Sequence, residues 1–322
     1  MDNVTHSLTG LALARAGLDR ICPQSTLLLI ISANIPDCDI ASLLNGRLAY
    51  LEVHRGYTHS LLFLPLMAAL SVGIVALIYR QKLQWSRAWL LCCLGVASHL
   101  LLDWTNSYGI RLLLPFSSTW FHLDLVGLWD LAIMIVLLFA ALWPILASLV
   151  SQEIGARKTR GRGLAMFALS FFLLWDLGRA YVHAVGVAQL NTRLYGGEFA
   201  ARVAVLPESI NPLHWRAIVE TRAAYRIFEP FNPFQSFEPE LGEVFFKPAT
   251  GGVRASAMQT EPFRYLAYFD RFPLWTVSPA TLDEKEVTRV ELTDLRFGNP
   301  GQTPFRCVAF EDGHDHVLQS GF

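Results

Sequence analysis

Histidine and aspartate residues with the spacing of metal ligands gather in the first third of the chain. Three short groups hold six of them: Pro36-Asp37-Cys38-Asp39, His54-Arg55-Gly56-Tyr57-Thr58-His59 and His99-Leu100-Leu101-Leu102-Asp103. Imidazole and carboxylate together suit zinc, manganese or iron. The pattern therefore predicts a divalent-metal site whose ligands are His6, Asp37, Asp39, His54, His59, His99 and Asp103.

The number of donors bears on how many ions such a site would hold. A catalytic zinc ion takes three protein ligands plus water, so seven donors exceed the need of one ion. We therefore expect two ions, zinc or manganese, although one ion with supporting carboxylates stays open. Asp37, Asp39 or Asp103 could act as a general base if it is not fully committed to the metal, with Asp37 and Asp103 preferred. Arg55, always charged and fork-shaped, could bind an anionic group of a substrate.

Each of these groups also has an ordinary structural explanation. Asp37 and Asp39 follow Pro36 and could cap a helix, since aspartate is a preferred N-cap. His54 and His59 could be interfacial histidines at the start of a helix, and Asp103 could reach out of its helix towards water. Asp130, and the tract His314-Asp315-His316, are weaker additional candidates because a helix cap and a solvated turn explain them.

The composition of the chain indicates a membrane protein. Of its 322 residues, 53% are hydrophobic and 16% are charged, against about 25% charged in a typical soluble domain. Four apolar runs approach or exceed the roughly 17–25 residues that a spanning helix needs: 59–79, 88–102, 128–150 and 164–187. Two further apolar segments, 5–17 and 24–36, are too short to span without tilting.

The character of the sequence changes near residue 190. Residues 1–189 are apolar with a helical pattern, whereas residues 190–322 hold most of the acidic groups and many prolines. Short alternating runs, at 201–205, 216–220 and 287–292, predict strands, and residues 229–262 look like a loop. The expected fold is an α-helical multi-pass membrane domain (1–189) that carries the metal site, followed by a small β-rich soluble domain (190–322).

Basic residues between the apolar runs predict the orientation. Arg80, Lys82 and Arg87 follow the first long run, and a second basic cluster at 157–162 follows the third. Loops rich in lysine and arginine stay in the cytoplasm, so both loops are expected there. The predicted ligands and the C-terminal domain would then lie on the extracytoplasmic side, and all seven candidate ligands would share one face.

Charge and cysteine usage exclude several classes of protein. The net charge is −1, which gives no reason to expect a nucleic-acid partner. The five cysteines are unpatterned and odd in number, which argues against a disulfide framework. The N-terminus lacks the basic region of a cleavable signal peptide, and phosphate-binding glycine motifs are absent.

These motifs resemble a family of inner-membrane metal-dependent hydrolases, also described as LexA-binding, inner-membrane-associated hydrolases. The resemblance covers about residues 1–140. It is carried by Thr5-His6 with Gly10, by Pro36-Asp37-x-Asp39, by the run His54 to Ser60, and by Ser98-His99-x-x-x-Asp103 followed by Gly109 and Pro115. Some members have a histidine directly after the second aspartate, where this chain has Ile40. The likeness implies a helical inner-membrane protein whose seven ligands, named above, carry a divalent metal, and the arrangement is distantly similar to zinc-dependent phospholipases C.

Three functions compete at this point. The leading hypothesis is a membrane-embedded hydrolase of an ester or phosphoester, in which a metal activates water, and a lipid-linked substrate is one option. A structural metal site with a partner-binding C-terminal domain is the second, and metal transport through polar groups such as Asp176 and His183 is the third. Structural zinc sites are closed whereas catalytic ones keep a position open, and sequence alone does not separate the two.

Overall fold

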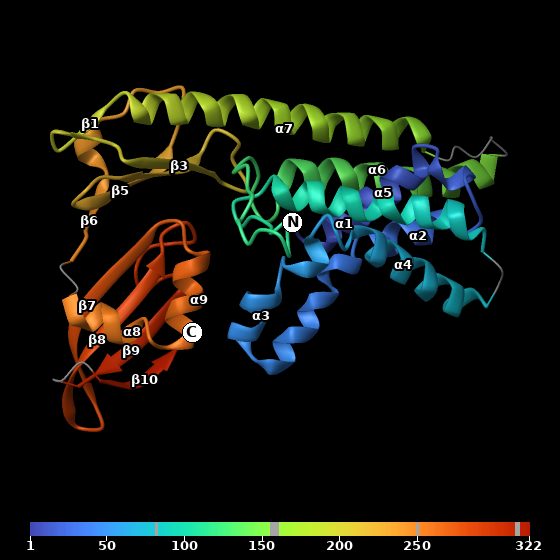
Figure 1. Cartoon of the computed structure of the whole chain (residues 1–322). Coiled ribbons are helices and arrows are strands. Elements are labelled where there is room, and N and C mark those ends of the chain that lie inside the picture. The colour runs from blue at the N-terminus through green and yellow to red at the C-terminus, as the bar shows by residue number, and fades with distance from the viewer. Residues whose placement is uncertain (81–82, 155–160, 249–250, 313–315) are drawn as a thin grey trace. The chain divides into compact units, whose positions relative to one another are not determined.

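The computed structural model describes residues 1–80, 83–154, 161–248, 251–312 and 316–322 (Figure 1). The chain divides into two compact units. The first comprises Met1–Leu44, Val53–His183 and Pro207–Pro212, and the second comprises Asn45–Glu52, Ala184–Leu206 and Leu213–Phe322. The first unit is helical and the second is mostly β-structure, so the predicted order of a helical part followed by a β-rich part is confirmed.

The helical unit is built from long helices joined by short turns. Its elements are α1 (Asn3–Arg15), η1 (Leu18–Arg20), α2 (Ser25–Ser32), η2 (Ile35–Asn45), η3 (Tyr57–His59), α4 (Leu64–Tyr79), α5 (Trp85–Trp104), α6 (Leu131–Ile154) and α7 (Arg162–Asn191). The short helix α3 (Arg47–Val53) falls mostly in the second unit, and α7 contributes residues up to His183 to the first unit. Asp2 begins α1 by accepting hydrogen bonds from the backbone of Val4 and Thr5, as an N-cap does.

Helix α2 lies at the centre of the helical packing. It contacts α1, α4 and α5, while α1 also packs against α6. Leu28 of α2, Val72 of α4 and Cys92 of α5 belong to one buried cluster, and Ile133 and Phe172 to another formed by α1, α6 and α7. Glycine residues lie where the helices pack most closely, and this close packing brings the candidate ligands together.

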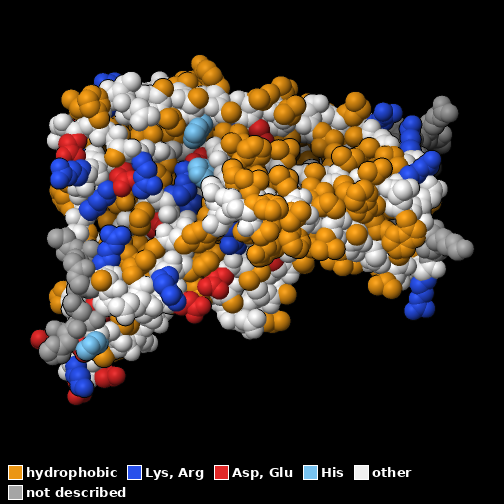
Figure 2. All heavy atoms as spheres, in the orientation of Figure 1, with side chains coloured by type: hydrophobic (Ala, Val, Ile, Leu, Met, Phe, Trp, Pro, Cys, Tyr) orange, Lys and Arg blue, Asp and Glu red, His pale blue; other side chains and the backbone are white. Residues whose placement is uncertain are grey.

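Among the residues that the structure describes, three helices are long and apolar enough to cross a membrane: Trp85–Trp104, Leu131–Leu149 and Arg162–Asn191. Two bent pairs, Ser25–Ser32 with Ile35–Asn45 and Arg47–His59 with Leu64–Tyr79, raise the number to five if each pair is one span. The run 59–79, expected to be one span, is therefore half of a bent pair. Figure 2 shows hydrophobic side chains over most of the visible face of these helices, with lysine and arginine gathered at the end where α4 meets α5.

The second unit contains two four-stranded sheets and a small hairpin. One sheet has the order β3-β4-β5-β6, the other has the order β10-β9-β8-β7, and β1 pairs with β2. The strands are β1 (Leu194–Tyr195), β2 (Glu198–Phe199), β3 (Arg202–Pro207), β4 (Trp215–Glu220), β5 (Ala224–Phe231), β6 (Glu243–Phe246), β7 (Pro273–Leu282), β8 (Lys285–Asp294), β9 (Arg306–Glu311) and β10 (Val317–Gly321). The three runs predicted as strands fall in β3, β4 and β8.

Apolar residues of both sheets form the core of the second unit. Ile218, Ile227, Leu274 and Leu295 are all buried in one cluster. The interpretation of residues 229–262 as a loop was wrong in part, because this segment holds η4 (Pro239–Leu241), β6, α8 (Gly251–Ala257) and the start of α9 (Glu261–Phe269). Prolines and glycines in the segment concealed short elements that are stabilised by packing rather than by a periodic pattern.

Candidate metal centre

Two glycines bring the helices that carry His6 and His99 close to α2. A Cβ atom on Gly10 of α1 would lie 2.7 Å from the carbonyl oxygen of Leu29, and one on Gly95 of α5 would collide with the side chain of Ser32. His6 lies one turn before Gly10, and His99 lies one turn after Gly95. Because both glycines contact the same helix, the two imidazole rings meet and stack with their centroids 3.8 Å apart.

Four of the predicted ligands converge on one point. One ligand atom each from Asp37, His59, His99 and Asp103 lies within 4.8 Å of all the others. The Nε2 atoms of His59 and His99 are 3.1 Å apart. Asp103 Oδ2 is 3.5 Å from each of them. Asp37 Oδ1 is 3.4 Å from His59 Nε2 and 3.6 Å from His99 Nε2. Two imidazole nitrogens and two carboxylate oxygens facing one another form a donor set that suits zinc.

A second group of ligands shares Asp37 with the first. Ligand atoms of Asp37, Asp39 and His54 also lie within 4.8 Å of one another. His54 Nδ1 and Asp39 Oδ1 are 2.9 Å apart, and the side chain of Asp39 is almost fully buried. The structure therefore brings together six of the seven predicted ligands in two groups, with Asp37 common to both.

Hydrogen bonds fix the tautomers of the two central histidines. His99 Nδ1 is 2.7 Å from the carbonyl oxygen of Ala33. Since a carbonyl only accepts, Nδ1 carries a proton, and in the neutral ring Nε2 is the nitrogen with the lone pair. The hydroxyl of Thr58 donates to Asp39 Oδ2 over 3.0 Å and so accepts from His59 Nδ1, 2.9 Å away. In the neutral form of each ring, the Nε2 atom that faces the first group is thus the one with the lone pair, which is the form that binds a metal.

His6 lies beside the first group rather than within it. Its Nε2 atom is 3.4 Å from Asp103 Oδ1, the oxygen that the amino nitrogen of Met1 also contacts. Within the part of the chain that the structure describes, neither ring nitrogen of His6 has a hydrogen-bond partner. Burial lowers the pKa of His6 to about 3. The ring is therefore neutral and can donate a lone pair.

Arg55 is buried against the centre, with 3% of its surface exposed. Its Nη2 donates to Asp103 Oδ1 over 3.1 Å. Its Nη1 donates to Asn106 Oδ1 over 2.9 Å and to the carbonyl oxygen of Gly109 over 3.2 Å. The guanidinium is thus held beside the first ligand group by its hydrogen bonds to Asp103 and to two neighbouring acceptors.

The two weaker candidates have other surroundings. Asp130 caps α6, since its Oδ1 accepts from the backbone of Ala132 and Ile133 and its Oδ2 accepts from Trp175 Nε1. His314 and Asp315 lie outside the described residues. His316 is exposed, with its Nδ1 3.4 Å from Asp312 Oδ2.

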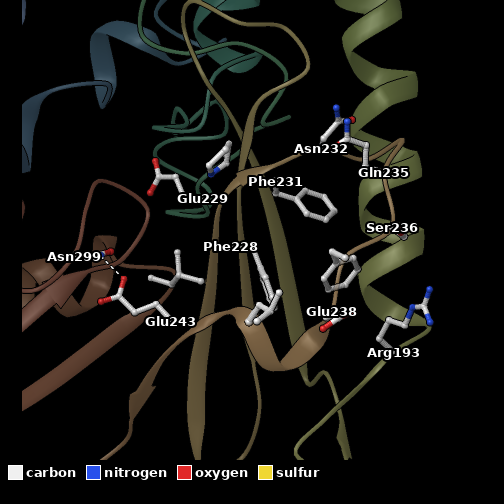
Figure 3. Close-up of a pocket in the computed structure, with 14 residues that line it drawn as sticks. Arg193, Phe228, Glu229, Phe231, Asn232, Gln235, Ser236, Glu238, Glu243 and Asn299 are labelled. Atoms are coloured by element: carbon white, nitrogen blue, oxygen red, sulfur yellow. Dashed lines mark hydrogen bonds between the residues drawn. The ribbon is translucent and has the colours of Figure 1, made fainter.

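The second unit has a cavity of about 880 Å³ (Figure 3). Its lining residues fall between Arg193 and Asn299 in the sequence, and none of them is a predicted metal ligand. Phe228 and Phe231 form part of its wall, with Glu229 and Glu243 on one side. Glu229 pairs with Arg216, and Glu243 accepts a 2.8 Å hydrogen bond from Asn299. Carboxylates already engaged in this way suit binding rather than acid–base chemistry.

A helical unit with membrane-spanning helices and a buried group of histidines and aspartates defines a membrane protein with a candidate metal centre. The chain belongs to the YdjM inner membrane protein family, whose sequence model matches residues 1–185, and the predicted inner-membrane location is confirmed to that extent. All seven predicted ligands fall in the matched region.

Two known proteins are similar to this chain. The uncharacterized protein YfhP of Bacillus subtilis (strain 168) is 30% identical in an alignment that covers all of this chain and 94% of that protein. The inner membrane protein YbcI of Escherichia coli (strain K12) is 35% identical over 120 residues, which are 36% of this chain and 68% of that protein. No solved structure matches the chain.

Proposed function

We propose that this chain is a membrane-embedded, metal-dependent hydrolase of an ester or phosphoester, with a lipid-linked substrate as one option. The observation that carries the proposal is the convergence of Asp37, His59, His99 and Asp103 in a buried part of the helical unit. Four segments far apart in the sequence supply the two ligand groups and His6 beside them. Such a set is hard to explain by packing alone, because each residue would be easier to bury as an apolar one.

The residues present fit a divalent cation. Asp37, Asp39 and Asp103 place three carboxylates close together, with 12%, 1% and 1% of their side chains exposed. Buried charges are normally paired or bound to metal. Among the described residues, Asp103 Oδ2 has no hydrogen-bond partner although it is fully buried. An unpaired buried carboxylate oxygen that faces two imidazole lone pairs is suited to a zinc or manganese ion.

The two groups support two ions rather than one. Asp37, His59, His99 and Asp103 would hold the first, and Asp37, Asp39 and His54 would hold the second, with His6 beside the first. When bound, divalent metals of this kind polarise the scissile group and lower the pKa of a bound water.

The chain's own residues have distinct roles in this scheme. Of the two carboxylates predicted to act in acid–base chemistry, Asp37 has the more accessible side chain and is better placed to exchange a proton with water. Asp103 is fully buried, and its Oδ1 is already engaged by Arg55 and Met1. We therefore propose Asp103 as a residue that mainly holds metal, and Asp37, which both ion positions share, as a general base that acts only through a carboxylate oxygen that does not bind metal.

We also propose that the metal centre and the second unit are extracytoplasmic. Arg87 lies near the start of α5 and Asp103 near its end, so 16 residues separate them by about 24 Å along the helix. The start of α5, where Arg87 lies and which is expected in the cytoplasm, is thus far from the ligand Asp103. Membrane lipids would surround the helices, and the cavity in the second unit would assist access of a substrate or partner.

The test is a screen of soluble phosphoesters, phospholipids and carboxylesters with purified protein in detergent, with and without added zinc or manganese. We expect turnover that requires metal and that Asp103→Asn abolishes, because a buried charge is lost with little change in shape. Asp312→Asn, in the second unit, is the matched control and should be as active as the wild type.

The alternative of a structural metal makes a different prediction. Zinc would then stay bound in stoichiometric amount and its removal would unfold the helical unit, yet no substrate in the screen would be turned over. A wild-type protein that keeps no metal after dialysis would instead contradict both the hydrolase and the structural-metal functions.

A further inference from the structure

Arg55 has a backbone conformation that arginine rarely adopts. Its φ angle is +56°, in the left-handed region that favours glycine. It lies between His54, a ligand of the second group, and the turn that leads to His59 of the first. A strained conformation inside a site persists only where the surroundings hold it, and here the contacts of Arg55 show what holds it.

The backbone of Arg55 contacts the second ligand group. Its N–H donates to Asp39 Oδ2 over 3.1 Å, and its carbonyl oxygen accepts from the N–H of Arg111 over 3.1 Å. The first of these bonds leaves Asp39 Oδ1 to face His54 Nδ1 at 2.9 Å. The left-handed conformation thus directs a backbone donor at one of the carboxylates of the second group.

The side chain of Arg55 contacts the first ligand group. Its Nη2 donates to Asp103 Oδ1, so that Oδ2 is the oxygen that faces His59 and His99. The guanidinium is itself fixed, by Asn106 Oδ1 at 2.9 Å and by the ring of Tyr108, whose centroid is 4.7 Å from Cζ. A planar fork with donors in fixed directions can satisfy Asp103 and Asn106 at once, which a lysine ammonium on a flexible stem does less well.

We propose that Arg55 is the positioning residue of the metal centre, and that its backbone sets the second ligand group while its guanidinium sets the first. This inference rests on the proposed metal site. It replaces direct binding of an anionic substrate as the role of Arg55, because Nη1 and Nη2 are committed to Asn106, Gly109 and Asp103. One residue thereby links the geometry of two metal positions.

Replacing Arg55 by glycine separates the two roles. Glycine adopts a positive φ without strain, so Arg55→Gly keeps the N–H that donates to Asp39 and removes the side chain with its guanidinium. We expect the ion of the first group to bind about 10–100-fold more weakly, the usual effect of removing a residue that orients a ligand, while the ion of the second group binds as in the wild type. Arg55→Lys should bind the ion of the first group with an affinity between those of the wild type and Arg55→Gly.

The measurement is zinc affinity by competition with a chromophoric chelator, together with the absorption spectrum of the cobalt-substituted protein. Arg15→Lys is the matched control for Arg55→Lys, because Arg15 is an arginine of the same unit that donates to the carbonyl oxygens of Ala140 and Ala141. The control should bind both ions normally. If Arg55→Gly does not fold, Asn106→Ala, which removes the acceptor that fixes the guanidinium, should weaken the same ion to a smaller extent.

The outcomes distinguish this inference from the proposed function. If wild-type protein binds two zinc ions and Arg55→Gly binds both with unchanged affinity, Arg55 does not position the centre, although the metal site stands. Where a substrate is known, a positioning role lowers kcat at unchanged KM, whereas binding of the substrate by Arg55 would raise KM and leave zinc affinity intact. A wild type that binds no zinc would refute the metal site and this inference with it.

Discussion

Asp37 is the residue that the two ligand groups have in common, so its replacement should affect both ions at once. Asp37→Asn leaves three donors in the first group and two in the second. Asp39→Asn leaves the first group complete, and His99→Ala leaves the second group complete. A position that has lost one donor should bind its ion too weakly to keep it through dialysis, so we expect two ions per chain after dialysis in the wild type, one in Asp39→Asn, one in His99→Ala, and none in Asp37→Asn.

The same logic gives a size for the effect on stability. An ion supplied at 100 times its Kd adds about 2.7 kcal/mol to the free energy of unfolding, so two ions add about 5.4 kcal/mol. For a chain of roughly this size, 1 kcal/mol shifts Tm by about 2–4 °C. Metal should therefore raise the Tm of the wild type by on the order of 10–20 °C, that of Asp39→Asn by about half as much, and that of Asp37→Asn hardly at all.

Elemental analysis after dialysis, and thermal unfolding in detergent with and without a chelator, measure these quantities. The comparison among the three variants is the control, since each of them alters one candidate ligand in the same buried region. If Asp37→Asn keeps two ions and the full gain in Tm, the view that one carboxylate serves both positions is wrong. Loss of both ions in all three variants would instead indicate a single cooperative site.

Two further predictions concern orientation and the second unit. In a cysteine-free background, an impermeant thiol reagent applied to intact cells should label Glu284→Cys and not Arg80→Cys; the reverse pattern would invert the proposed topology. Burial and the charge of Asp294 raise the pKa of Asp270 well above its ordinary value. Folding therefore favours the protonated form of Asp270. Its contribution to the free energy of unfolding should be fully present below the pKa of Asp270 in the unfolded chain and should be lost as the pH rises through the pKa in the folded protein. The contribution is about 1.4 kcal/mol for each unit by which the two pKa values differ. Asp270→Asn, which mimics the protonated side chain and can keep the hydrogen bond from Phe272 N–H, should raise Tm at pH 7 and flatten its pH dependence; a lower Tm at pH 7 would contradict this.

The sequence predicted the layout of the helical unit better than the limits of its helices. Long apolar runs located α5, α6 and α7 because the requirement to span a bilayer leaves a strong compositional signal. The run that starts at His59 was harder, since hydrophobicity does not show where the helix begins. Helix α4 starts only at Leu64, where Pro65 falls in the first turn, a position that proline favours.

For the candidate site, residue types and spacing predicted the ligands, but the contacts that orient those ligands could not be predicted from the sequence. Helical spacing placed His99 and Asp103 on one face, and the basic loops placed all the ligand segments at one end. The carbonyl of Ala33, which sets the tautomer of His99, leaves no trace in the sequence because every residue has a carbonyl. Equally, nothing in the sequence shows that Asp37 belongs to both groups or that Arg55 has a positive φ, because both depend on how η2 and the 54–59 turn meet.

The breaks in the bent helix pairs are themselves an argument for a bound cation. Asp37 and Asp39 lie in a pair that bends by 42°, and His54 and His59 lie just before the 92° bend of the other pair. Irregular backbone at membrane depth leaves polar groups without water and is tolerated where it is buried in protein or lines a cavity. Here the bends bring three carboxylates together, an arrangement that repulsion would oppose in the absence of positive charge. Arg55 and the amino nitrogen of Met1 supply some of that charge at Asp103, but both contact Oδ1 and leave Oδ2 facing two imidazole nitrogens. A divalent cation between these atoms would compensate the carboxylates and hold the bent segments in register, so its removal should loosen the segments 35–45 and 54–63 before the rest of the helical unit.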